Sequence, residues 1–231
     1  MALALAGYSY MTGRDTPPIG ESRDGLERSL RAGIAVYNAG HYHAAHDAWE
    51  AIWLDLPDGE DERLLHGLIQ YTAAIHHARA RNWAGATGLG GSAREYLDGL
   101  SETHRGVDLG PVRRALANLG ADPEWIERAR PPRLTHRGEA LSGADLDAEE
   151  CLLAAMPLAS GRGEDVAAVE RACEYAREAI ETGTSNPFLA LCTDYVRRPT
   201  HRDLVYGRLT DHAARRRSRE RDVAGLFDPD G

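Results

Sequence analysis

Apolar side chains recur at intervals of three or four residues along most of this chain, and this spacing constrains the fold more than any other feature. Leu26, Leu30, Ile34 and Tyr37, for example, fall on one face of a helix, because a helix turns by about 100° per residue. No alternation of apolar and polar residues extends over more than a few positions. The sequence therefore predicts an all-α fold, a compact helical bundle of antiparallel helix hairpins with additional C-terminal helices.

Proline and glycine residues predict where the helices begin and end. Residues 12–20 and 131–143 contain prolines and carry no helical pattern. We therefore expect a disordered leader over residues 1–20, a helical domain over 21–130, a linker over 131–144 and a C-terminal helical segment over 145–231 that packs on the first domain. The first predicted helix stops near residue 40, and the others cover residues 43–54, 61–79, 83–100, 111–119, 123–130, 145–156, 164–182, 187–197 and 200–222.

The chain is acidic and contains no lysine. It has 36 Asp and Glu residues against 27 basic residues, all of them Arg, and a formal net charge of -9. An excess of carboxylates keeps a protein surface solvated, and a lysine-free acidic chain suggests a GC-rich source adapted to high salt. A general nucleic-acid binder needs a concentrated basic surface, so we do not expect nucleic acid as a partner.

Nine arginines lie between residues 197 and 221. They could form an arm that binds nucleic acid, or they could belong to a solvated helix end. Asp203, Asp211 and Glu220 interleave with them at spacings that allow ion pairs within a helix. We therefore expect the arginines to pair with acidic neighbours.

The cysteines and the first residues bear on the compartment. Cys151, Cys173 and Cys192 are odd in number and lack the C-x-x-C spacing of metal and redox sites, so we expect reduced thiols and a cytoplasmic protein. The apolar residues 1–10 lack a basic n-region and are fewer than the ~20 residues of a membrane-spanning helix. Neither a secretion signal nor a membrane span is expected.

One ordered pattern of motifs stands out between residues 34 and 100. It begins with the stretch YNAGHYHAAHDAWEAIW at residues 37–53, continues with Gly-Leu-Ile-Gln at residues 67–70, and closes with His77, Asn82, Gly85 and Ala86. These blocks, in this order and spacing, resemble the family called domain of unknown function 309. Asp47 stands where that family more usually has Glu. The resemblance implies a compact helical fold and brings no activity, substrate or cofactor.

The motifs contain a group of polar residues that two neighbouring helices could bring together. A short turn at residues 57–60 makes the two helices antiparallel neighbours, so their polar stripes can face each other. We predict that His46, Glu50, Gln70 and His77 converge between them. The two stripes are His46, Glu50 and Trp53 on the first helix, and His66, Gln70 and His77 on the second.

Two interpretations of this cluster compete. In the first, a buried His-Glu-Gln network fixes how the helices dock in a non-enzymatic structural or interaction module, whose partner is another protein or a second copy of the chain. In the second, His46, Glu50 and His77 bind a divalent metal in a metal-dependent enzyme, a hydrolase, with Asp47 or Gln70 orienting them. The spacing lacks the second His of the zinc-protease motif H-E-x-x-H. Because a buried polar group must be paired whether or not it has a function, we favour the network.

The other histidines and the large aromatic residues of this region are expected to have structural roles. Adjacent residues such as His76 and His77 cannot point the same way on a helix, so at most one of them joins the cluster. We expect His41, His43, His76 and His104 at the surface, and Tyr42, Trp49, Trp53 and Trp83 in the core or in helix contacts.

Overall fold

A computed structural model describes residues 23–226 of the chain. The fold is all-α, as predicted, with ten α-helices and one pair of two-residue strands in this range. The leader predicted over residues 1–20 lies outside the described residues. Within the described range, no helix combines the length and the apolar character needed to cross a membrane.

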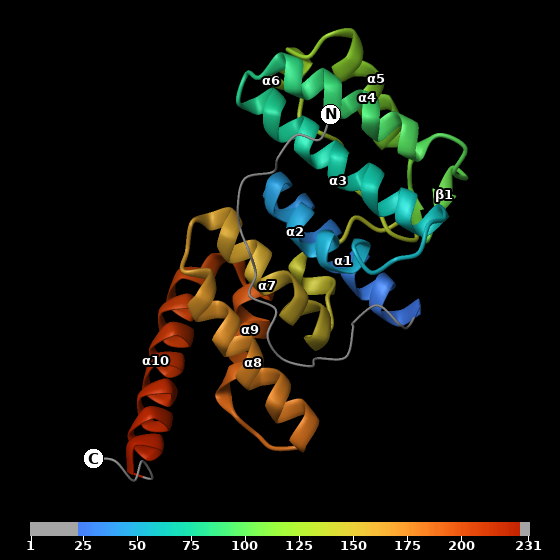
Figure 1. The fold of residues 1–231 in the computed structure, drawn as a ribbon. Helices are drawn as coiled ribbons and strands as arrows, with labels where there is room; N and C mark the ends of the chain where they lie inside the picture. The colour runs from blue at the N-terminus through green and yellow to red at the C-terminus, as the bar shows by residue number, and fades with distance from the viewer. Residues whose placement is uncertain (1–22, 227–231) are drawn as a thin grey trace.

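The N-terminal group of helices is built around α3. In Figure 1 this helix, drawn in teal, lies between α2 and α4, and it packs against both. Asp122 and Pro123 were expected to open the helix over residues 123–130, but Asp122 is the C-cap of α5, and α6 starts two residues later with Glu124 at its N-cap and is shorter than expected. The bounds are α1 Arg23–Asn38, α2 Tyr42–Trp53, α3 Glu60–Arg79, α4 Trp83–Leu97, α5 Gly110–Ala121 and α6 Trp125–Arg128.

The C-terminal group joins the first group through α7, which packs on α1 and α2 (Figure 1). Asp147 and Glu150 form a capping box at the start of α7, each carboxylate accepting a hydrogen bond of 2.8 Å from the other residue's amide. Glu150 also pairs with Arg31 of α1 at 2.5 Å, which ties the two groups together. The bounds are α7 Ala148–Arg162, α8 Val166–Thr182, α9 Pro187–Arg197 and α10 Arg202–Leu226, with 3-10 turns at Gly143–Asp145 and Pro199–His201. All three cysteines lie buried in this group and are free.

The segment between the groups is held on α1 by a residue of the motif. Asn38 donates from its amide nitrogen to the carbonyls of Leu134 and Leu141, both at 2.9 Å, and accepts from the Leu134 amide at 2.9 Å. Both leucines are buried. The stretch predicted as a linker thus adds side chains to the core. Before it, the antiparallel strands β1 Thr103–His104 and β2 Val107–Asp108 are too short for a sequence pattern to predict.

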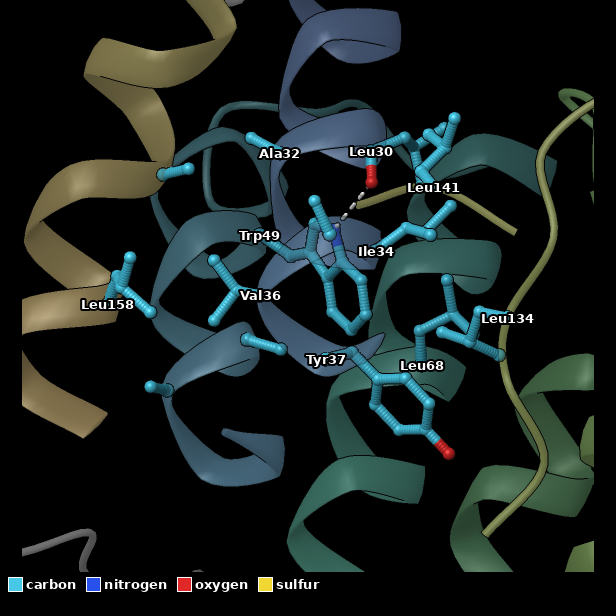
Figure 2. Packing of buried hydrophobic residues seen from close by; sticks show 14 of the residues in the cluster. Leu30, Ala32, Ile34, Val36, Tyr37, Trp49, Leu68, Leu134, Leu141 and Leu158 are labelled. Carbon is cyan, nitrogen blue, oxygen red and sulfur yellow. Dashed lines mark hydrogen bonds between the residues drawn. The ribbon is translucent and has the colours of Figure 1, made fainter. Parts of the chain in front are cut away.

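The core centres on Trp49, which is fully buried between α1 and α3 (Figure 2). Its indole nitrogen donates to the Leu30 carbonyl at 3.5 Å. The ring lies so close to α1 that a Cβ atom on Gly33 would stand 2.1 Å from the indole nitrogen. Only glycine fits at that position, so Gly33 and Trp49 together set how closely α1 and α2 approach.

Candidate functional site

Two ring contacts establish how α2 and α3 lie against each other. Near the end of α2, the ring of Trp53 lies 4.4 Å from that of His66. Near its beginning, the ring of His43 stacks on that of His76 at 4.5 Å. The helices are therefore antiparallel neighbours, and in this register His46 lies opposite Ala73 and Glu50 opposite residues 69–70.

The predicted cluster is partly assembled along α2. His46 is buried, with 8% of its surface exposed, and its Nε2 atom lies 3.5 Å from Glu50 Oε1. The Glu50 side chain is 42% exposed, so solvent competes for the carboxylate. Neither His46 Nδ1 nor Gln70 Oε1 has a hydrogen-bond partner among the described residues, although both atoms are buried. The expectation that these groups satisfy one another is therefore wrong for these two atoms.

His77 is held in a different arrangement, at the corner between α3 and α4. Its Nδ1 atom lies 2.8 Å from the amide nitrogen of Asn82. Asn82 caps α4 by accepting from the Gly85 amide at 3.0 Å. A Cβ atom on Gly85 would stand 2.8 Å from His77 Nδ1, so a glycine is needed at this position. The geometry of this corner therefore explains why His77, Asn82 and Gly85 occur together in the motif. Direct contact between His77 and His46 is absent from the described part of the chain.

His43 and His76 are exposed, as expected, and their rings belong to a row of histidines across the two helices. His46 contacts His43 at a ring distance of 5.8 Å, His43 stacks on His76, and His76 contacts His77 at 5.9 Å. Loss of solvent around the rings is the main cause that lowers the pKa of His43 and of His76, and the neighbouring imidazoles lower both further. These two rings are therefore uncharged at neutral pH.

A pocket of about 460 Å³ opens beside this row, where α2 and α3 meet the end of α7. Arg79 lies over the ring of Tyr42 at 5.3 Å and has no ion pair with a described residue. His41 holds the α7 side of the pocket through a 3.0 Å hydrogen bond between its Nδ1 atom and the Gly161 carbonyl. Among residues 23–226, no side chain caps the first turn of α2. The lining residues are Gly40, His41, Tyr42, His43, Ala44, His76, Arg79, Ala80, Ser160 and Gly161.

A second polar group lies at the other end of the hairpin, and sequence reasoning did not identify it. Glu62 accepts a hydrogen bond from the Trp53 indole at 2.7 Å and pairs with His66 Nδ1 at 3.1 Å. The ring of His66 also stacks on that of Tyr96 from α4 at 3.7 Å. The four-residue spacing of Glu62 and His66 was the available signal. Trp53 and Tyr96 lie on two other helices, so no local spacing in the sequence links them to Glu62 and His66.

The paired cluster is Trp53, Glu62, His66 and Tyr96. The unpaired cluster is His43, His46, Glu50, Gln70, His76 and Arg79, named for the buried His46 Nδ1 and Gln70 Oε1 atoms that have no partner among the described residues.

The ligand set of the enzyme interpretation is not gathered at one point. Within residues 23–226, no group of three or more His, Cys, Asp or Glu side chains is arranged to hold a metal ion. Asp47, considered as an orienting residue, keeps part of its surface in solvent, while its carboxylate accepts a hydrogen bond from the Ser160 hydroxyl of α7. Reduced solvent access is the main cause that raises the pKa of its carboxyl.

With this geometry in place, the chain can be compared with known families. Residues 30–89 match the family model described as Domain of unknown function (DUF309). This match confirms the resemblance that the motifs predicted. Comparison with curated proteins gives no match. The DUF309 match covers less than half of the chain, from the middle of α1 into α4, and includes all of the unpaired cluster. Ser160 and Gly161, which line the pocket from α7, lie outside it.

Proposed function

We propose that this protein is a non-enzymatic helical binding module whose pocket beside the unpaired cluster receives a small anionic group, such as a carboxylate or phosphate. The group belongs to a small ligand or to the side chain of a protein partner. The DUF309-matched helices provide the unpaired cluster, and α7 closes the other side of the pocket.

The observation that carries this proposal is the set of polar groups without partners on one side of the hairpin. Buried polar atoms in folded proteins are nearly always hydrogen-bonded, so His46 Nδ1 and Gln70 Oε1 call for partners outside the described contacts. Neither residue lines the pocket, and Gln70 Oε1 is an acceptor, so its partner is a donor such as water and not the anion itself. Arg79 adds a guanidinium without an ion pair at the pocket itself, and guanidinium is the side chain best suited to bind carboxylate or phosphate.

The uncharged histidines fit the same role. A neutral imidazole has one donor and one acceptor nitrogen, so His43 and His76 can donate hydrogen bonds to an anion without a competing carboxylate in the pocket lining. An anion bound here would contact both helix groups and stabilise their docking.

Thermal denaturation with phosphate and with acetate tests the proposal. A ligand at tenfold its Kd stabilises the folded state by about 1.4 kcal/mol, which raises the Tm of a chain this size by about 3 to 6 °C. We expect a saturable rise in the wild-type protein and its loss in Arg79→Gln. Arg81→Gln is the matched control. It removes the same charge two residues further along the chain, and Arg81 is already paired with Glu127 at 2.8 Å. An equal rise in Arg79→Gln, or no rise with either anion, would refute the proposal.

The metal-dependent hydrolase is the alternative, and elemental analysis of protein purified without a His tag decides between the two. A binding module should carry substoichiometric metal, and added zinc should not change its Tm. Near one metal per chain, lost in both His46→Ala and His77→Ala, would instead establish the metal site.

A further inference from the structure

The long C-terminal helix α10 packs through one face only. Val205, Leu209 and Ala213 are buried against α8 and α9, and the guanidinium of Arg216 lies 3.9 Å above the ring of Tyr175. Since these residues share one side of the helix along most of its length, the opposite side faces outward. In Figure 1, α10 accordingly forms the outer edge of the C-terminal group.

Most of the C-terminal arginines are not paired as the sequence suggested. Pairing with acidic side chains is confirmed for Arg198, which contacts Asp194 at 2.8 Å, and for Arg216. Arg197 and Arg202 donate to main-chain carbonyls instead. For the remaining five the expectation is wrong, since they have no ion pair within the described range: Arg208, Arg215, Arg217, Arg219 and Arg221.

These five arginines, which have no ion pair among residues 23–226, form two rows along the outward side of α10. Arg208, Arg215 and Arg219 fall on one row, which is about 16 Å long at a rise of about 1.5 Å per residue. Arg217 and Arg221 form a second row. The two rows flank the line along α10 that faces directly away from α8 and α9. Over the length of the rows, the line between them holds small or acidic side chains, namely Gly207, Asp211, Ala214, Ser218 and Asp222, and one exposed leucine, Leu204, lies on the same line at the start of the helix.

We propose that this two-row face of α10 binds duplex DNA, with the helix in the major groove and one row of arginines on each phosphate backbone. The major groove of B-form DNA is about 12 Å wide and admits an α-helix. Small side chains on the line between the rows let the helix approach, and arginines on both sides can reach the two strands, since phosphate contacts fix the position of a protein on the duplex.

Charge and shape favour DNA over other polyanions. Five guanidiniums without an ion pair in the described range face outward against three carboxylates, those of Asp203, Asp211 and Asp222, in a chain whose overall charge is -9, so binding is confined to this face. A membrane-binding helix would need an apolar stripe beside the arginines, and the line between the rows has none. The deep, narrow major groove of double-stranded RNA does not admit a helix.

Fluorescence anisotropy of the full chain with a labelled mixed-sequence DNA duplex tests the proposal. Each phosphate contact contributes about -0.9 to the slope of log K against log salt, so five contacts weaken binding about 500-fold between about 50 and about 200 mM salt. Replacing the first row, R208Q/R215Q/R219Q, should make the slope about 2.7 less steep, and R217Q/R221Q about 1.8 less steep. R208K/R215K/R219K keeps the charge and should keep the slope.

The matched control removes the same charge from arginines that are already paired. R28Q/R81Q/R198Q takes three exposed guanidiniums from ion pairs elsewhere on the surface, and binding should keep the wild-type slope. Circular dichroism should show unchanged helix content in every variant. The proposal is overturned if the wild-type protein shows no salt-dependent binding to DNA. It is also overturned if the slope of log K against log salt falls as much in the control as in the first-row variant. Equal binding to double-stranded RNA of the same sequence, or to phosphatidylserine vesicles, would also overturn it.

Discussion

The paired and unpaired clusters lie on the same helix hairpin, and both contain a histidine and a glutamate four residues apart. In the paired cluster, Glu62 is 18% exposed, pairs with His66 at 3.1 Å and also accepts from Trp53. In the unpaired cluster, Glu50 is 42% exposed and lies 3.5 Å from His46, whose other ring nitrogen has no described partner. The same local spacing therefore produces a satisfied network in one place and an unsatisfied one in the other.

The difference arises from the helices that cover each cluster. Tyr96 of α4 lies on His66 and excludes solvent from the paired cluster. Among the described residues no ring from α4 stacks on the unpaired cluster, and α7 packs on α2 but leaves the pocket open beside that cluster. A polar pair that a third helix covers stabilises the fold, whereas a polar pair beside an open pocket is available to a ligand.

The largest effect is expected at the paired cluster. Glu62→Ala removes the acceptor of both Trp53 and His66, and each donor left unsatisfied costs about 1 to 3 kcal/mol. Because these side chains are partly exposed, we expect about 2 kcal/mol in total, measured by urea denaturation. The matched change Glu50→Ala should cost less than about 0.5 kcal/mol, since that carboxylate is solvated. Equal losses in the two variants would remove the distinction between the clusters.

The next effect tests whether His77 belongs to the corner and not to the unpaired cluster. Asn82→Ala removes the cap of α4 and should cost about 1 kcal/mol. Asn82→Asp keeps an oxygen for the Gly85 amide and should recover most of that stability. Both variants should respond to phosphate as the wild type does. If Asn82→Ala no longer responds to phosphate, the His77 and Asn82 corner takes part in binding at the pocket.

The pH dependence of stability should come from the stacked pair in the unpaired cluster. The pKa of His43 and of His76 is lowered in the folded state, so the unfolded chain, with a histidine pKa near about 6.5, binds more protons as pH falls. Stability is therefore full above about pH 6.5 and is lost as the pH drops below that value. The charged or titratable groups around the pair are His46, Glu50, His77 and Arg79.

Replacing the pair gives the measurement. In His43→Gln/His76→Gln, the Tm should fall less between about pH 7.5 and about pH 5 than in the wild type, because two groups that favour the unfolded state at low pH are gone. Differential scanning calorimetry at several pH values measures both curves. An unchanged decline would mean that other groups carry the acid sensitivity.

The fold could be predicted from sequence because its signals are local. Apolar spacing located the helices, and prolines and glycines located most of their ends, since both depend on neighbours within one turn. The His46 and Glu50 pair was predicted for the same reason. The Glu62 and Trp53 bond was not, because it depends on how α3 is rotated against α2, and the Tyr96 contact depends on where α4 packs.

The arginines of α10 show the same limit. Helical spacing predicts the pair of Arg216 with Glu220, and the structure contains it at 2.9 Å. It does not predict the pair of Arg216 with Glu178, which comes from α8. Nor does it predict that Arg215 and Arg217 have no pair, because a favourable spacing along one helix does not ensure that two long exposed side chains meet.

The smallest expected effect is the most direct test of the unpaired cluster. Gln70→Leu replaces a side chain whose buried Oε1 atom has no described partner with an apolar one of similar size. Removing an unsatisfied buried acceptor relieves a desolvation cost of about 1 to 3 kcal/mol. The change of side-chain shape lowers stability and offsets part of this gain. We therefore expect the free energy of unfolding to be unchanged or to rise by up to about 1 kcal/mol. Urea denaturation without added anions measures it. A loss above about 1 kcal/mol would mean that Gln70 already has a stabilising partner in the free protein, as Glu62 does, and the contrast between the clusters would fail. If the variant is as stable as the wild type but gains less from phosphate, Gln70 acts on the ligand and not on the fold.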